Sequence, residues 1–343
     1  MIKTDVVIVG AGPCGLFQVF ELGLLGLKAH VVDSIAQPGG QCTELYPDKP
    51  IYDIPAVPVC TGQELTDNLL KQIEPFGAEL HLGDEVTELE PRGDGFYLKT
   101  FKGVEFEASA VIIAAGVGSF QPRQIRAADA ADYEGTGIVY RVRNPEQYAG
   151  KKLVIFGGGD SALDWVLALH PIAEHITLVH RRDEYRAVDA SVDKMRALVA
   201  AGEMDLYENT KAKAFHGTDG TLESVTIADK EGNETTIEAD HAMVFFGLAP
   251  KLGPIAGWGL DINRKTINVD TEKFETSTPG IYAIGDINFY PGKKKLILSG
   301  FHEAALAAFA IKARLEPGKK VHLQYTTTSP VMHERLGVSE AAE

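Results

Sequence analysis

The first part of the chain passes from an apolar run to an amphipathic stretch and back to an apolar run. Residues 6–9 (VVIV) are continuously apolar, which is typical of a parallel strand buried on both faces. A second strand is expected at residues 30–32. Between the two strands, apolar residues recur with the spacing of one helix face, at Leu16, Phe17, Phe20 and Leu24. The pattern predicts a β-α-β unit over residues 5–33.

The same order of elements recurs over residues 153–182. An apolar strand (LVIF) leads into a glycine-rich turn, a helix and a second strand at residues 176–179. Two such units predict an α/β protein with two Rossmann-like, three-layer dinucleotide-binding domains. A chain of 343 residues is long enough for two domains.

The turn of the first unit has the glycine spacing of a dinucleotide-binding fingerprint. Gly10 permits the tight turn, Gly12 lets a pyrophosphate approach the backbone, and Gly15 lets the helix pack on the strand. The helix N-terminus directs free N–H groups at the pyrophosphate. Asp33, 23 residues after Gly10, ends the second strand, where a carboxylate accepts hydrogen bonds from ribose hydroxyls. We expect an unphosphorylated ribose here, as in FAD.

The second unit differs at the position where the ribose would lie. His180 is again 23 residues after the first glycine of the turn, and Arg181 and Arg182 follow it. Cationic side chains pair with a 2′-phosphate, which an acid would repel. We therefore expect NADPH rather than NADH; the alternative is a solvated basic surface. The residues expected to bind NADPH are Gly157, Gly159, Asp160, Ser161, His180, Arg181, Arg182 and Arg186.

A later segment indicates that the first domain is completed after the second. Residues 281–286 (IYAIGD) are interpreted as an apolar strand ending in Gly-Asp, so that Asp286 can bind a ribityl hydroxyl. The helix that follows Gly300 can direct its positive end at the flavin. The NADPH domain is thus inserted into the FAD domain. The expected bounds are 1–120 and 250–343 for the FAD-binding domain and 121–249 for the NADPH-binding domain.

Charge and cysteine content narrow the class of protein. The chain has 33 basic and 48 acidic residues, a net charge of −15, which argues against nucleic-acid or anionic-membrane binding. Its first residues predict a strand rather than a secretory signal, and no apolar run of about 18 residues predicts a membrane span. An odd number of cysteines without CxxC spacing fits a reducing cytoplasm, namely Cys14, Cys42 and Cys60. We expect no metal.

In combination, the segments GAGPCG, AAGVGSF, GGGDSA, HRRDEYRA and AIGD resemble the low-molecular-weight thioredoxin reductase family over nearly the whole chain. That family has a redox CxxC upstream of the second glycine turn, where this chain has Arg141 and Asn144. The other class of disulfide reductase has a cysteine pair after its GG segment. Here Cys42 is followed five residues later by Pro47. Thiol–disulfide exchange needs an attacking thiolate and a resolving partner, so neither reaction is expected.

The segments GGQ, LYP and IYDIPAVP resemble the ferredoxin–NADP reductases that are similar to thioredoxin reductase. This resemblance implies that Tyr46 stacks on the flavin, although a core aromatic is the alternative. It also implies that residues 320–343 cover the other face of the flavin from the second subunit of a homodimer. The stacking ring in that segment is His322 or Tyr325, with a solvent-exposed side chain as the alternative for His322. The full set expected to bind FAD is Gly10, Gly12, Gly15, Asp33, Gln41, Tyr46, the backbone of Val86, Phe120, Asp286 and Thr327.

The resemblance implies a ferredoxin–NADP reductase, which passes electrons from NADPH through FAD to ferredoxin or flavodoxin. No catalytic side chain is expected, because the flavin supplies the chemistry. The alternative is an NADPH-dependent flavoprotein reductase of quinones or other small acceptors. Docking of an acidic partner to this acidic chain requires a local basic patch. The candidates are residues 293–295, Arg141 with Arg143, and Arg123 with Arg126.

Overall fold

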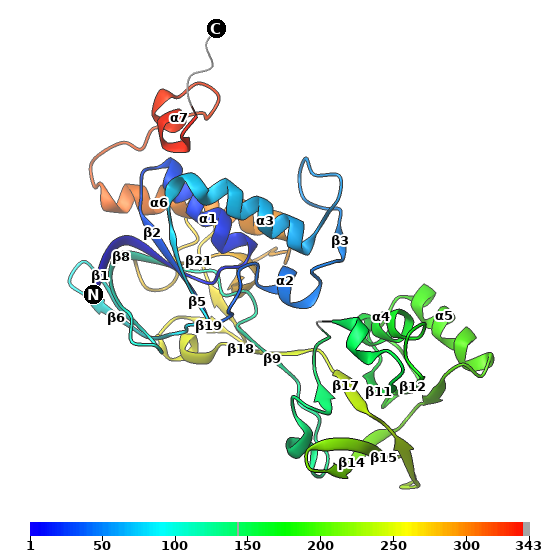
Figure 1. Ribbon diagram of the computed structural model, residues 1–343. Coiled ribbons are helices and arrows are strands. Elements are labelled where there is room, and N and C mark those ends of the chain that lie inside the picture. Colours follow the sequence, from blue (N-terminus) through cyan, green and yellow to red (C-terminus); the bar gives the residue numbers. More distant parts are fainter. Residues whose placement is uncertain (143, 339–343) are drawn as a thin grey trace. The chain divides into compact units, whose positions relative to one another are not determined.

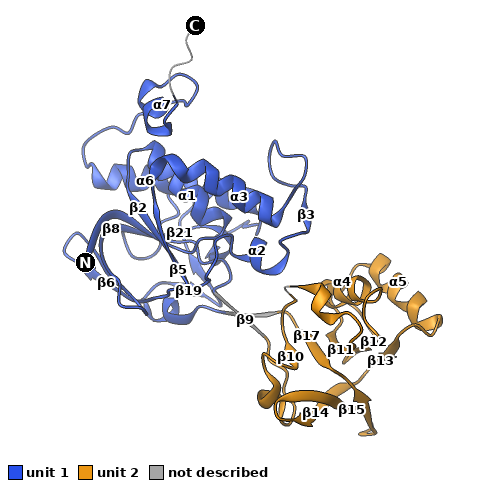
Figure 2. Ribbon diagram, in the orientation of Figure 1, with its two compact units in different colours: residues 1–119, 250–343 blue, residues 120–249 orange. Residues whose placement is uncertain are grey.

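The computed structural model describes residues 1–142 and 144–338, except for the side chains of residues 119–122 and 248–250. The chain forms two compact units (Figures 1 and 2). Unit 1 contains Met1–Ser119 and Pro250–Glu343, and unit 2 contains Phe120–Ala249. Each unit has a sheet that is wholly or mainly parallel, with helices beside it, and the second unit is inserted into the first. Among the described residues, no helix is long and apolar enough to cross a bilayer.

Unit 1 is built on a seven-stranded sheet in the order β5-β2-β1-β8-β7-β6, with β21 also paired to β8. Strands β5, β2, β1, β8 and β21 are parallel, whereas β7 and β6 fold back antiparallel. The first half of β8 pairs with β7 and its second half pairs with β21. The bounds are β1 Ile2–Val9, β2 Ala29–Asp33, β5 Glu79–Leu82, β6 Val86–Arg92, β7 Gly95–Thr100, β8 Glu105–Ile113 and β21 Ile281–Ala283.

The alternation of side chains along β1 divides the core of unit 1 into two layers. Val6 and Ile8 pack toward the helices α1, α3 and α6, whereas Val7 and Val9 belong to the cluster on the opposite face of the sheet. Helix α1 packs between α3 and α6 (Figure 1). The helices are α1 Pro13–Leu24, α2 Gln41–Leu45, α3 Gly62–Ile73, α6 Ile297–Leu315 and α7 Pro330–Leu336.

Short elements complete unit 1. A small sheet, β19-β20-β22, lies in the chain between the inserted unit and α6, and β3 pairs with β4. The bounds are β3 Pro50–Ile51, β4 Cys60–Thr61, η1 Glu74–Phe76, η4 Gly253–Gly257, β19 Ile262–Asn263, β20 Thr266–Asn268, η5 Gly285–Ile287 and β22 Asn288–Phe289. The turn η5 carries Asp286 and directly follows β21.

Unit 2 has a five-stranded parallel sheet in the order β10-β17-β11-β12-β13. Helices α4 and α5 cover one face, where Leu163 and Met195 are buried. The antiparallel sheet β14-β15-β16 contributes Phe215 and Val225 to the other face. The bounds are β10 Ile138–Val139, β11 Lys152–Gly157, α4 Asp160–Leu169, β12 His175–Val179, α5 Asp189–Ala200, β13 Asp205–Tyr207, β14 Lys211–Thr218, β15 Thr221–Ala228, β16 Glu234–Glu238 and β17 His241–Phe245; the 3-10 turns η2 and η3 span Ala130–Tyr133 and Pro145–Tyr148.

The two segments that connect the units pair with each other. Strand β9 (Ser119–Pro122) and strand β18 (Leu248–Lys251) form a two-stranded ribbon. The chain therefore enters and leaves unit 2 through neighbouring backbone segments.

Candidate functional site

The turn between β1 and α1 requires glycine at two positions and leaves space at a third. Gly10 has a φ of +115°, and a Cβ there would lie 2.4 Å from the carbonyl oxygen of Ala114. A Cβ on Gly15 would lie 1.9 Å from the carbonyl oxygen of Gly10. A Cβ on Gly12, the N-cap of α1, would meet nothing within 4 Å. The space beside Gly12, at the amino end of a helix, fits a pyrophosphate.

Asp33 is held at the end of β2 by backbone groups. Its Oδ2 accepts a hydrogen bond from the amide of Ala11 at 2.6 Å, and its Oδ1 accepts one from Ile35 at 2.8 Å. Burial raises the pKa of the Asp33 carboxyl, and the two backbone hydrogen bonds oppose this rise. Each carboxylate oxygen can accept more than one hydrogen bond, so ribose hydroxyls can still bind to Asp33.

Gln41 and Asp286 lie beside each other although they are 245 residues apart in sequence. Gln41 Nε2 donates a hydrogen bond to Asp286 Oδ2 at 3.3 Å. Gln41 begins α2 directly after Gly40, where a Cβ would lie 3.1 Å from the Cα of Gly12. The two expected flavin-binding side chains therefore converge beside the glycine turn. This arrangement fits an FAD that extends from the turn toward η5.

A buried polar network supports the turn that presents Asp286. Glu303 of α6 is fully buried. Its carboxylate accepts hydrogen bonds from the Gly285 amide at 2.7 Å, from Asn288 Nδ2 at 2.8 Å and from the Tyr290 hydroxyl at 2.9 Å, and it forms an ion pair with Lys293. The side chain of Lys293 is only 4% exposed. Sequence reasoning gave Glu303 no role, because these partners become neighbours only in the fold.

Tyr46 is half-buried and its hydroxyl lies 3.6 Å from the Cys42 sulfur. Burial raises the pKa of Tyr46 well above its usual range. The ring packs at the margin of the helical core of unit 1.

Cys14 lies against two other parts of the site, since a Cβ on Gly300 would be 2.2 Å from its sulfur and one on Gly285 would be 3.1 Å away. Burial, with Asp286 as the next contribution, raises the pKa of the Cys14 thiol to about 12.

The remaining expected FAD residues occupy different places. Val86 is buried and opens β6, where it pairs with Thr100. Phe120 lies in β9, whose side chains are outside the described part. Thr327 is exposed and lies in the turn before α7.

The C-terminal segment packs on its own chain away from Gly12. Arg335 Nη1 of α7 donates a hydrogen bond to the carbonyl oxygen of Leu24, which is the last residue of α1. At 1.5 Å per residue, the 12 residues of α1 place Leu24 about 18 Å from the amino end of that helix. His322 is exposed and Tyr325 is 65% exposed. The contact of this segment with α1 is thus made at the carboxyl end of that helix, opposite the glycine turn.

The second glycine turn repeats the geometry of the first. A Cβ on Gly157 would lie 2.7 Å from the Cβ of Ala162 and 2.8 Å from the Phe245 carbonyl oxygen. Gly159 is the N-cap of α4, and a Cβ there would meet nothing within 4 Å. Asp160 Oδ1 accepts a hydrogen bond from the Val188 amide at 3.0 Å, and Ser161 is exposed beside it. This turn also fits a pyrophosphate.

The basic loop after β12 folds back over this turn. The amide of Arg186 donates a hydrogen bond to the carbonyl oxygen of Gly158 at 2.8 Å, and a Cβ on Gly158 would lie 2.3 Å from the ring of His180. His180 Nε2 lies 3.1 Å from the Glu184 carbonyl oxygen. Burial lowers the pKa of His180, which disfavours the charged form of its ring. The exposed cations of the loop are Arg181, Arg182 and Arg186.

A thiol relay is absent from unit 2, whose residues include no cysteine. Arg141 and Asn144 stand where the resemblance would require two cysteines, and Asn144 Oδ1 accepts a hydrogen bond from Glu146 at 3.2 Å at the start of η3. All three cysteines of the chain are free thiols.

Comparisons with known proteins assign the chain to a class. Residues 4–310 match the family described as pyridine nucleotide-disulphide oxidoreductase. The chain therefore belongs to that family. A relative from Methylibium petroleiphilum, named ferredoxin–NADP reductase, is 61% identical over 342 residues, which cover 98% of this chain and 93% of the relative. Within its class, the chain belongs to this ferredoxin–NADP reductase family.

Two further comparisons agree with this assignment. Ferredoxin–NADP reductase 2 of Cupriavidus metallidurans is 58% identical over 338 residues, or 98% of this chain and 92% of that one. The crystal structure of Lactococcus lactis thioredoxin reductase has a TM-score of 0.73 at 25% identity, covering 92% of this chain and 99% of that one. The resemblance and the α/β fold class inferred from the sequence are confirmed.

Proposed function

We propose that this protein is a ferredoxin–NADP reductase, which transfers electrons between NADPH and ferredoxin through FAD. The observation that carries the proposal is the difference between two similar glycine turns. One is followed by Asp33 and the other by Arg181 and Arg182, and no dithiol accompanies either. The names of the two relatives support the same reaction. The protein is an oxidoreductase whose cofactors are FAD and NADP(H).

Unit 1 is the proposed FAD-binding domain. Gly12 and the amino end of α1 bind the pyrophosphate, Asp33 binds the ribose, and Gln41 and Asp286 bind the ribityl end. FAD, when bound there, would supply the redox chemistry that links the two-electron exchange with NADPH to the one-electron exchange with ferredoxin. The residues of the chain position the two nucleotides and exclude water. No acid or base among them is needed for the transfer, which depends on the approach of the two rings.

Unit 2 is the proposed NADPH-binding domain. Gly159 and the amino end of α4 bind the pyrophosphate, and Arg181 and Arg182 bind the 2′-phosphate through charge-assisted hydrogen bonds. The ring of His180 lies beside Gly158, and its lowered pKa leaves the charge at the 2′-phosphate mainly to the two arginines.

A basic groove on unit 1 is the proposed docking site for an acidic ferredoxin. The groove has a volume of about 670 Å³. Its lining comprises Val117, Asn263, Arg264, Lys265, Thr266, Phe289 and Lys295. Phe289 is 40% exposed and lies three residues after Asp286, while Val117 lies three residues after Ala114, which contacts Gly10. Two lining residues of the groove are thus close in sequence to residues of the proposed flavin site, which supports a short path for electron transfer.

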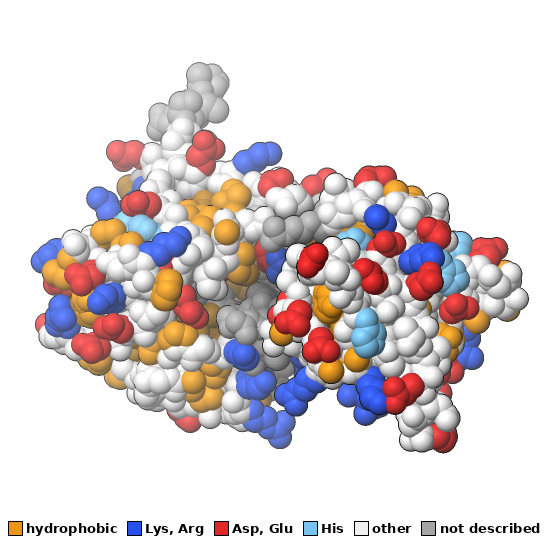
Figure 3. Space-filling model, turned by 60° about the horizontal axis from the view of Figure 1, so that its bottom comes forward, with side chains coloured by type: hydrophobic (Ala, Val, Ile, Leu, Met, Phe, Trp, Pro, Cys, Tyr) orange, Lys and Arg blue, Asp and Glu red, His pale blue; other side chains and the backbone are white. Residues whose placement is uncertain are grey.

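The groove differs from the basic patches suggested by the sequence alone. Lys293 cannot contact a partner, because its buried side chain pairs with Glu303. Lys294 and Lys295 are exposed, as are Arg123 and Arg126 in unit 2, whereas Arg143 is outside the described residues. Figure 3 shows Lys and Arg side chains in separate groups among many acidic ones. A local basic group can steer an acidic partner within such a mixed field.

A homodimer in the cytoplasm is also part of the proposal. The C-terminal segment exposes Leu323 by 63% and Tyr325 by 65%, and its Arg335 contacts the carboxyl end of α1 rather than the glycine turn. Both observations support the proposal that Thr327, with His322 or Tyr325 stacked on the flavin, covers the flavin of a second subunit. The three free cysteines support a reducing compartment.

The decisive experiment is anaerobic reduction of the purified yellow protein by NADPH, followed by rapid mixing with ferredoxin or with a small quinone. We expect NADPH to bleach the flavin and ferredoxin to reoxidise it over many turnovers. Charge reversal of Lys295 to Glu should slow reoxidation by ferredoxin at low salt and leave reoxidation by quinone unchanged. Fast reoxidation by quinone with none by ferredoxin would instead identify a reductase of small acceptors.

A further inference from the structure

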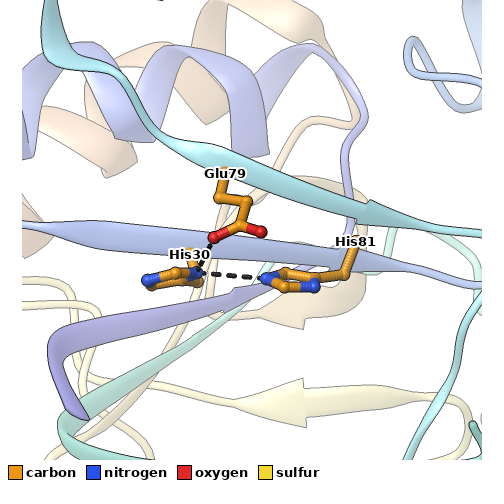
Figure 4. A group of neighbouring side chains, drawn as sticks. All are labelled: His30, Glu79 and His81. Atoms are coloured by element: carbon orange, nitrogen blue, oxygen red, sulfur yellow. Dashed lines mark hydrogen bonds and ion pairs between the residues drawn. The ribbon is translucent and has the colours of Figure 1, made fainter. Parts of the chain in front are cut away.

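Three side chains that can bind a metal converge at one edge of the main sheet of unit 1. His30 comes from β2, and Glu79 and His81 come from the neighbouring edge strand β5 (Figure 4). His30 is paired in register with Glu79. Glu79 and His81 are two residues apart in one strand, so their side chains point to the same face of the sheet. The fold thus brings the three groups together from two adjacent strands.

The distances suit the coordination of one ion. His30 Nδ1 lies 3.1 Å from His81 Nε2 and 3.7 Å from Glu79 Oε2. One ligand atom from each residue lies within 4.8 Å of the others. Two ligand atoms on a tetrahedral Zn²⁺, each at about 2.0–2.1 Å, are about 3.3 Å apart. The nitrogen pair is already near that separation, and the carboxylate needs a small movement.

The packing around the two imidazoles fixes their orientation. Their rings are stacked at a centroid distance of 5.3 Å and an angle of 29°. Phe106 of β8 contacts both, with centroids 5.6 Å from His30 and 5.2 Å from His81. The Glu79 side chain is 65% exposed, whereas that of His30 is 18% exposed. Two packed rings and one exposed carboxylate form a site that is open to solvent on one side.

We propose that His30, Glu79 and His81 bind one divalent transition-metal ion of the Zn²⁺ type, with a fourth coordination position open to water. Two imidazoles and one carboxylate favour Zn²⁺, Co²⁺ or Ni²⁺ over Mg²⁺ and Ca²⁺, which prefer oxygen ligands. The bound ion joins the edge strand β5 to β2 and so stabilises the open edge of the sheet.

The ion site is separate from the proposed nucleotide sites. His30 lies three residues before Asp33 on β2, which corresponds to roughly 10 Å along the strand. His30 also points to the face of the sheet that is opposite the helices, since its neighbour Val31 belongs to the helical core. The ion therefore binds without displacing FAD, and its binding does not depend on the proposed reaction.

The test is a Zn²⁺ titration of the full-length flavoprotein, purified without a polyhistidine tag and freed of metal by a chelator. We expect calorimetry to give one Zn²⁺ per chain. With Co²⁺ in place of Zn²⁺, we expect absorption bands typical of tetrahedral coordination, at wavelengths longer than those of the flavin. His81→Gln should weaken Zn²⁺ binding at least about tenfold. Glu79→Gln changes only an exposed side chain and should weaken binding without any effect on folding.

A matched control comes from unit 2. His175 and Asp205 also pair on adjacent parallel strands, at 2.9 Å, but lack a third ligand among the described residues. His175→Gln should leave Zn²⁺ affinity unchanged, and Zn²⁺ should raise the thermal midpoint of the unaltered protein and of this control. The proposal is wrong if no saturable binding occurs, or if His81→Gln and Glu79→Gln bind Zn²⁺ as the unaltered protein does. In that case the two imidazoles form only a hydrogen bond with each other.

Discussion

The carboxylate of Glu303 accepts a hydrogen bond of 2.7 Å from the backbone amide of Gly285, the residue that precedes Asp286. This contact attaches the turn η5 to helix α6. The position of Asp286, which accepts the hydrogen bond from Gln41, therefore depends on the buried carboxylate of Glu303. A buried carboxylate is tolerated there because Lys293 neutralises it and three further donors surround it.

Replacement of Lys293 by Met should destabilise the protein strongly. The variant leaves the buried charge of Glu303 without its counter-ion, and loss of one partner of a buried pair typically costs about 3–5 kcal/mol. Urea denaturation with the FAD content measured in parallel would reveal both the loss and the displacement of η5. Lys294→Met removes a neighbouring exposed cation and should change the free energy of unfolding by less than about 0.5 kcal/mol. Equal effects in the two variants would contradict a role for the buried pair.

Alanine at the second and the third glycine of the first motif should have different consequences. Gly15→Ala places a Cβ against the Gly10 carbonyl, so we expect a loss of about 3 kcal/mol or more in the free energy of unfolding. Gly12→Ala meets no atom of the protein and should cost no more than about 1 kcal/mol as an N-cap change. It should nevertheless weaken FAD binding, which can be measured by the increase in flavin fluorescence as FAD dissociates from the protein. Normal FAD affinity in Gly12→Ala would show that the pyrophosphate does not lie there.

The double variant Arg181→Ala, Arg182→Ala should lose its preference for NADPH. Hydrogen bonds to a charged group contribute about 1.5–3 kcal/mol each, so the loss of even one of them should raise KM for NADPH roughly ten- to hundredfold, and the loss of both should raise it further. KM for NADH should change little, because NADH has no 2′-phosphate. Steady-state kinetics with both nucleotides provides the measurement, and Lys194→Ala, an exposed cation of α5, is the control. A parallel loss with NADH would place the arginines outside the 2′-phosphate site.

The thiol of Cys14 should be inert in the native flavoprotein. With a pKa of about 12, only about one thiol in ten thousand is ionised at pH 8, and alkylation requires the thiolate. Mass spectrometry after iodoacetamide treatment at pH 8 should find Cys14 labelled only when urea is present. The pKa is raised on folding from 9.0 to about 12, so the contribution of this thiol to stability is complete below about pH 9 and is lost as the pH rises through 12. Rapid labelling of the native protein would contradict this.

The sequence predicted the local backbone structure around both glycine turns. The β-α-β pattern and the glycine spacing depend on neighbouring residues, so the turns at Gly10 and Gly157 could be located from the order of residues alone. The α/β class, the family and the two cofactors were also inferred correctly. All of these inferences depend on the β-α-β units and their glycine turns, in which the interacting residues are close in sequence and the backbone conformation restricts which residues fit.

Features that depend on distant residues were not accessible from the sequence. Lys293 was treated as a surface cation because three lysines in a row normally face solvent, and only the fold shows its contact with Glu303. His30 and His81 are 51 residues apart, without any metal-binding spacing. The groove around Phe289 likewise unites residues from several loops. No periodic pattern records such contacts, because they arise from strand order and packing.

The insertion of one unit within another affects how the protein can be synthesised. The second half of β8, residues 111–113, pairs with β21, yet the ribosome produces 130 other residues (Phe120–Ala249) for the inserted unit in between. The inserted unit can complete its own sheet while it emerges. The first sheet stays open at β8 until residues 281–283 have been translated. In a nascent chain, unit 2 can therefore complete its fold before unit 1 does. Until then, the unpaired edge of β8 is the place where a chaperone would protect the chain.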